Sequence, residues 1–87
     1  MLWSTTLFDA RHSTEDIFKA LFQNDLVQNV TGTNLLTTAD AYGQPKTSIA
    51  TAYRMTRDTY NRINWDYFDT DNLDVVADVS YVNYNIF

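Results

Sequence analysis

The chain has 87 residues, no cysteine and a formal net charge of −5. This length leaves room for one thin hydrophobic core and predicts a single small domain over residues 1–87, with neither disulfides nor the cysteine ligands of common structural zinc sites to reinforce it. The six basic residues form no cluster, which excludes direct nucleic-acid binding from the functions we expect, because such binding needs a basic face against phosphate.

Residues 1–12 are predicted to form an extended arm or a short strand, because apolar residues alternate weakly with neighbouring threonines. The segment lacks the basic start and long apolar run of a signal peptide, and no stretch approaches the roughly 18 apolar residues of a membrane span. We therefore expect a soluble, unexported protein that makes no membrane contact.

A helix is predicted over residues 13–25. The Ser13 hydroxyl can accept from the exposed amides of the first turn, and Glu15 and Asp16 follow where the helix dipole favours negative charge. Four apolar side chains then recur at helical spacing. They are Ile17, Phe18, Leu21 and Phe22. This stripe predicts that one side of the helix packs on another element.

A β-hairpin is predicted over residues 34–56, because two runs rich in Thr, Ile, Tyr and Ala flank the turn cluster 42–45. Alternation along the second run places four side chains on one face of the sheet. They are Ile49, Thr51, Tyr53 and Met55. We expect this face to pack on the helix and the other face to remain uncovered.

Residues 62–87 are predicted to form the C-terminal strands. Ile63, Trp65 and Tyr67 alternate with polar residues, and after a turn the β-branched and aromatic pattern resumes from Val75 to the end of the chain. The expected fold class is α+β, with one N-terminal helix packed on a small antiparallel β-sheet of about four strands.

Residues 36–48, with Thr38, Asp40, Gly43, Pro45 and Ser48 at their characteristic spacing, resemble the first hairpin of flavin-binding split-barrel proteins, the pyridoxamine-phosphate-oxidase-like group. The resemblance implies a truncated flavin-binding domain, in which Arg54 and Arg57 are the nearby basic residues for a flavin phosphate. This is one alternative for the function.

The residues that could carry chemistry favour a protein that is not an enzyme. His12, the one histidine, is expected on an exposed turn without a nucleophile or an orienting partner. Residues 66–74 hold several carboxylates, but Leu73 and Asp74 stand where a calcium loop needs a ligand and a glycine. No catalytic residue, metal site or cofactor is predicted.

The C-terminal third carries the net charge. Residues 1–57 hold five acids and five bases, whereas residues 58–87 hold six acids against one base, Arg62, so that 1 − 6 = −5. This imbalance supports a second alternative, an acidic inhibitor that presents the carboxylates of residues 66–78 to a nucleic-acid enzyme as phosphate mimics.

Two Trp, six Tyr and five Phe are a heavy aromatic load for so small a core, and Tyr and Trp are enriched at protein interfaces. Residues 79–87 also have apolar side chains on both faces, whereas one helix covers only one face. A central strand in an ordinary monomer is the alternative interpretation. The predicted partner-binding residues are Trp65, Tyr81, Tyr84 and Phe87.

These features predict a small structural protein that acts through protein–protein contacts, either as an oligomer or as part of a larger assembly. The Asn-, Thr- and Tyr-rich, cysteine-free composition is similar to that of bacteriophage virion components of the head, connector or tail.

Overall fold

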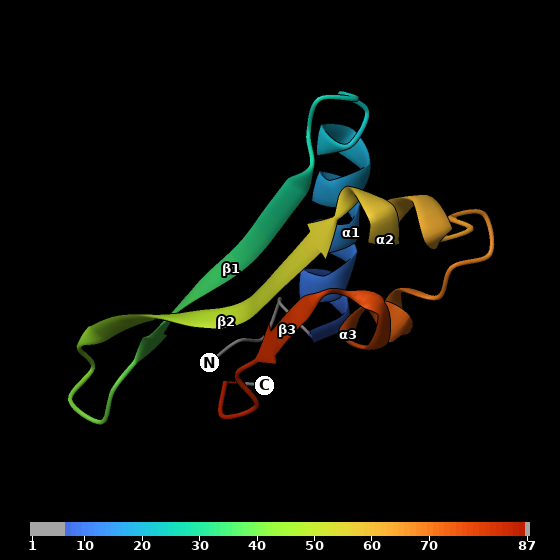
Figure 1. Cartoon of the computed structure of the whole chain (residues 1–87). Coiled ribbons are helices and arrows are strands. Elements are labelled where there is room, and N and C mark those ends of the chain that lie inside the picture. The colour runs from blue at the N-terminus through green and yellow to red at the C-terminus, as the bar shows by residue number, and fades with distance from the viewer. Residues whose placement is uncertain (1–6, 87) are drawn as a thin grey trace.

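The computed structural model describes residues 7–86. Helix α1 (Leu7–Leu21) is followed by the strands β1 (Asn29–Ala39) and β2 (Pro45–Thr56). The remaining elements are α2 (Arg57–Arg62), the 3₁₀ turn η1 (Thr70–Asn72), α3 (Leu73–Val76) and β3 (Val79–Val82). The strands form one antiparallel sheet in the order β1-β2-β3, with α1 packed against it (Figure 1). The α+β fold class is confirmed, with three strands in the described part of the chain rather than about four.

Helix α1 begins six residues earlier than predicted. Its buried side has a four-residue spacing that starts at Ala10 and continues through Thr14 and Phe18. Ser13 lies inside the helix on its exposed side, so its predicted capping role is wrong. Residues 7–12 are therefore helical rather than extended, and residues 1–6 of the predicted arm lie outside the described residues.

The predicted hairpin is confirmed, although β1 begins at Asn29 rather than at residue 34. The Asp40 carboxylate holds the turn by accepting hydrogen bonds from the backbone amides of Tyr42 at 2.8 Å and Gln44 at 2.9 Å. Gly43 has a φ of 76°, a left-handed conformation that glycine adopts without strain.

A β-bulge at Ala50 reverses the side on which Ile49 lies. Asn34 pairs with Thr51 but Leu35 pairs with Ile49, so β2 carries one extra residue at this point. Thr51, Tyr53 and Met55 are buried as predicted, whereas Ile49 is exposed on the opposite face. The prediction for Ile49 is wrong because uninterrupted alternation does not account for an inserted residue.

The strand predicted around Ile63, Trp65 and Tyr67 is also absent from residues 7–86. This segment forms turns in which the Trp65 ring packs 5.1 Å from the Tyr60 and Phe68 rings, and its indole N–H donates to the Tyr60 carbonyl at 3.3 Å. Ile63 and Trp65 pack against the core, whereas Tyr67 is exposed. Only Val79–Val82 of the predicted C-terminal strands is a strand in the structure.

The core lies between α1, α3 and the half of the hairpin nearest to these helices, which is the start of β1 and the end of β2. It consists of Phe18, Phe22, Val30, Tyr53, Met55 and Leu73. Strand β1 approaches α1 closely at Gly32, where a Cβ atom would stand 3.1 Å from the Thr14 methyl group. No helix within residues 7–86 has the length and apolar character needed to cross a bilayer.

The hairpin makes the molecule elongated, with principal extents of 47 × 25 × 18 Å. Its radius of gyration is 14.4 Å, against about 12 Å for a compact chain of this length. Figure 1 shows the far half of β1 and β2 extending beyond the helices. Residues 35–49, which we call the arm, include no buried side chain.

Candidate protein-docking surface

One face of the sheet packs on the core and the other is open. In β1 the even-numbered side chains from Val30 to Thr38 are buried or half-buried, and the odd-numbered ones are exposed. Because directly paired residues point to the same side of a sheet, the register defines three rows on the open face. They are Thr31–Arg54–Val79, Thr33–Ala52–Tyr81 and Leu35–Ile49. We call these eight residues the outer face.

The outer face is apolar for a solvent-exposed surface. Leu35 is 60% exposed, Ile49 45%, Val79 51% and Tyr81 48%. These four side chains come from three strands and lie in adjacent rows, so they form a continuous patch rather than scattered single residues. Contiguous apolar surface of this kind marks interaction sites on proteins.

Strand β1 also presents an open edge. It is the terminal strand of the sheet, and no other described strand pairs with its outer side. The Arg57 amide donates to the Gln28 carbonyl at 2.8 Å and the Asp40 amide to the Gln44 carbonyl at 2.9 Å. Gln28 and Asp40, the even-numbered residues just before and just after β1, are therefore both in hydrogen-bonded pairs. Because such pairs recur at every second residue, the even-numbered residues of β1 direct their backbone N–H and C=O groups at β2.

The odd-numbered residues of β1 therefore direct their backbone N–H and C=O groups away from β2. They are Asn29, Thr31, Thr33, Leu35, Thr37 and Ala39. The 2.8 Å contact between the Thr37 and Thr47 hydroxyls supports this assignment, because side chains lie closer in pairs that exchange no backbone bonds. Pro45, which has no N–H, occupies another such pair, opposite Ala39.

The predicted partner-binding residues fall in different places. Tyr81 lies on the outer face, and Tyr84 is exposed in the turn that follows β3. Trp65 is half-buried in the aromatic cluster, and Phe87 lies outside the described residues. Leu35 and Ile49 are the surface residues that sequence analysis missed, since the bulge that places them together leaves no clear signal in the sequence.

The strongest electrostatic cluster supports the fold rather than the surface. Asp74 on α3 accepts hydrogen bonds from Arg11 on α1, with Nη2 at 2.6 Å and Nε at 3.3 Å, and from the Tyr53 hydroxyl on β2. Burial alone would raise the pKa of Asp74, but these bonds hold it below its usual value. Burial, together with the hydrogen bond to Asp74, raises the pKa of Tyr53 to about 12.

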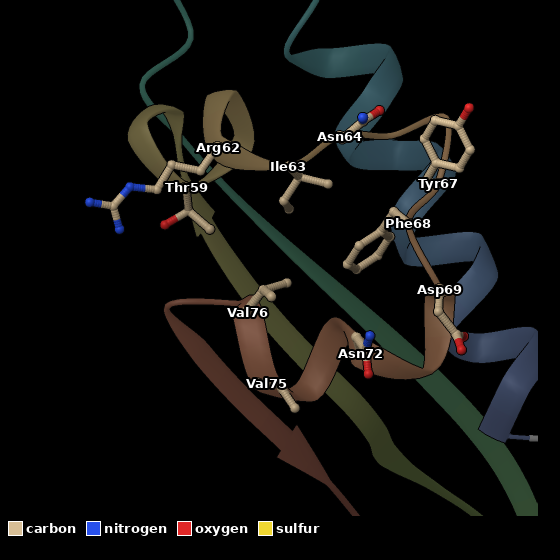
Figure 2. A pocket seen from close by; sticks show the side chains of 10 residues that line it. All are labelled: Thr59, Arg62, Ile63, Asn64, Tyr67, Phe68, Asp69, Asn72, Val75 and Val76. Carbon is tan, nitrogen blue, oxygen red and sulfur yellow. The ribbon is translucent and has the colours of Figure 1, made fainter.

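A groove of about 560 Å³ lies between α2, the following turns and α3. Figure 2 shows Ile63, Phe68 and Val76 directed into it, while the guanidinium of Arg62 extends away. No described side chain has a buried polar atom without a hydrogen-bond partner. The lining of the groove combines apolar and polar side chains and contains neither histidine nor cysteine.

The residues behind the alternative functions have structural partners. Arg57 donates to the carbonyls of Phe22, Asn24 and Val27, so its guanidinium is engaged where a flavin phosphate would need it. Arg54 is exposed and donates to the Asn29 side chain at 2.8 Å.

Several of the C-terminal carboxylates are likewise used within the chain. Asp69 caps η1, and Asp78 accepts from the Thr56 amide at 2.7 Å. This bond and the Thr59 and Thr56 hydroxyls hold the pKa of Asp78 below its usual value. No group of three or more His, Asp or Glu side chains within residues 7–86 is placed to hold a metal ion.

His12 lies on the exposed side of α1 rather than on the predicted turn. Its ring stacks on Phe8 at 5.9 Å, and Nε2 is 3.9 Å from the Asp16 carboxylate.

Comparison of the chain with protein-family models, curated proteins and solved structures finds no match. What the chain does is therefore inferred from its geometry.

Proposed function

We propose that this chain is a small non-enzymatic assembly protein that acts by binding other polypeptides, either its own copies or the subunits of a larger structure. The observation that supports this most is the outer face, where Leu35, Ile49, Val79 and Tyr81 expose a continuous apolar patch beside an open strand edge. Burying such a patch against another chain is favourable by about 25 cal/mol for each Å² of apolar surface removed from water.

The projecting arm supports the same function. Its fifteen residues, 35–49, contribute no buried side chain, so they add nothing to the core of an isolated monomer. Ordering such a segment costs conformational entropy, which contacts with a second chain can offset. A bacteriophage virion, in its head, connector or tail, is the setting that the cysteine-free, Asn-, Thr- and Tyr-rich composition favours.

Sedimentation velocity of the native chain tests the proposal. We expect association at micromolar concentration that Ile49→Asp weakens, because this substitution places a carboxylate beside Leu35 in the apolar patch of the outer face. Leu26→Asp is the matched control, since Leu26 is almost fully exposed in the loop that precedes β1 and lies off the sheet. A native chain that sediments as a stable, compact monomer would contradict the proposal.

A further inference from the structure

We infer that two copies of this chain pair through the open edges of β1, antiparallel and about a two-fold axis, so that their sheets join into one. This inference rests on the proposed function and names both the surface and the partner. The carrying observation is that β1 is an 11-residue edge strand whose odd-numbered residues direct their backbone groups outward. An edge of this kind is a template for adding another strand.

Strand β1 lacks the features by which proteins protect exposed edges. Residues 29–39 contain no charged residue and no proline, and the bulge of the hairpin is in β2, so the β1 backbone continues without interruption. Within residues 7–86, β2 is flanked by β1 and by the short β3, and the turn after β3 covers the bulge, where the Asn83 amide donates to the Ala50 carbonyl at 2.8 Å. The long open edge is therefore on the β1 side.

A second copy fits this edge because the edge is complementary to itself. In a two-fold pairing centred on Asn34, Thr33 faces Leu35 of the second copy and Thr31 faces Thr37. Outward-directed residues then meet only outward-directed residues, and each of the six pairs exchanges two backbone hydrogen bonds. A pairing in which one copy contributes the same patch as the other closes after two chains.

The side chains on the outer face support the same register. Leu35 and the Leu35 of the second copy become diagonal neighbours beside the axis, each flanked by its own Ile49. Both residues are exposed in the single chain, so pairing covers apolar surface that nothing else in residues 7–86 covers. The two outer faces also lie on the same side of the joined sheet and form one larger surface.

Charge favours β1 over the opposite edge. Residues 58–87 carry a net charge of −5, and the strand that they contribute, β3, lies on the side of β2 away from β1, so pairing through β1 keeps the two copies of β3 at opposite ends of the joined sheet. The strands that meet have little charge. Residues 29–56 contain one acid, Asp40, and two bases, Lys46 and Arg54. Pairing through β3 would instead bring like charges together.

Two proline variants of the arm test the inference. Thr37 and Thr47 face each other across the arm and each directs its N–H to a different open edge, Thr37 to that of β1 and Thr47 to that of β2. A two-fold dimer contains the Thr37 N–H bond across the β1 edge twice, and Thr37→Pro removes both copies. We therefore expect the dissociation constant of the dimer, measured by sedimentation equilibrium, to rise about 30-fold. Thr47→Pro also removes the contact between the Thr37 and Thr47 hydroxyls but no bond across the β1 edge, so it should change the dissociation constant by less than about twofold.

Amide exchange in the native chain gives a second measurement that needs no variant. The amides of Thr31, Thr33 and Thr37 should exchange fast in the dilute monomer and become protected on association, whereas that of Val30 is protected in both states. Equal effects of the two proline variants, or unprotected Thr31 and Thr33 amides in an associated state, would overturn edge pairing and leave the proposed function standing. A native chain that stays monomeric would refute both.

Discussion

At the scale of single residues, Asp74 joins three parts of the fold that are distant in sequence. Its carboxylate binds Arg11 of α1 and Tyr53 of β2, so α1, β2 and α3 meet through one group. Charge-assisted hydrogen bonds of this kind are about twice as strong as neutral ones. The short helix α3 has few residues with which to anchor itself, and Asp74 and the buried Leu73 are its main contacts.

The lowered pKa of Asp74 makes the stability of the fold depend on pH. A carboxyl group whose pKa is lower in the folded than in the unfolded state stabilises the fold above its unfolded pKa of about 4, and this contribution is lost as the pH falls through the folded value. Asp74→Asn should lower the free energy of unfolding at about pH 7 by on the order of 1 kcal/mol and reduce its decline between about pH 4 and pH 2.

Urea denaturation at both ends of this pH range measures the effect. Asp66→Asn is the control, because Asp66 is exposed and its side chain has no ion-pair partner among residues 7–86. An Asp74→Asn variant with the native pH dependence would show that the Arg11–Asp74 contact contributes nothing to folding.

At the scale of elements, Arg57 connects the end of α1 to the sheet. Its guanidinium donates to the carbonyls of Phe22 at 2.9 Å, Asn24 at 2.6 Å and Val27 at 3.1 and 2.9 Å, all of them in the segment that joins α1 to β1. It also lies 4.9 Å from the Phe22 ring. A planar group with five N–H donors can reach all three carbonyls at once, whereas an ammonium group cannot.

Arg57→Lys should therefore destabilise the fold by about 1–2 kcal/mol although the charge is kept. Arg54→Lys, three residues earlier and exposed, loses a single bond to Asn29 and should change stability by less than about 0.5 kcal/mol. Thermal melting of both variants measures the difference. Equal melting temperatures would show that the carbonyls after α1 are satisfied equally well by water.

Sequence reasoning succeeded for elements whose signal is local and failed where tertiary contacts decide. The hairpin was predictable because Gly43 and Pro45 mark its turn, and the helix because Phe18 and Phe22 recur on one side. The early start of α1 could not be predicted, because its first buried residue is Ala10, which is too small to stand out as part of an apolar stripe. Nor could the bulge at Ala50, because only the paired register reveals an inserted residue.

The candidate surface could be predicted in outline but not in its members. An uncovered sheet face follows from having one main helix and a sheet, and Tyr81, one of the predicted partner-binding residues, lies exposed on that face. Trp65 was predicted to bind a partner because of the heavy aromatic load and the enrichment of Trp at interfaces, whereas in the structure its ring packs in the aromatic cluster. Aromatic composition alone does not distinguish a ring that fills a thin core from one that meets a partner.

At the scale of the whole molecule, the chain divides into a body that carries the core and an arm that does not. Every buried side chain in the described residues lies outside residues 35–49, and the arm is held mainly by its own ladder, its turn and Asp40. Two side-chain amides link the arm and the body where they meet. That of Asn34 donates to the Thr14 and Thr51 hydroxyls at 3.0 and 2.9 Å, and that of Asn83 donates to the Ile49 carbonyl at 3.3 Å. Stability and association should therefore be separable by shortening the hairpin.

Replacing residues 37–47 with Asn-Gly tests this separation, because Leu36 and Ser48 are directly paired and a two-residue turn can join them. We expect the shortened chain to melt cooperatively, with its free energy of unfolding changed by no more than about 1 kcal/mol, since no buried contact is removed. Its association should be lost, because the deletion of Thr37 and Ala39 removes four of the six residue pairs in the two-fold edge contact. Loss of cooperative melting would instead show that the arm and the body fold as one unit, and undiminished association would place the contact on the body.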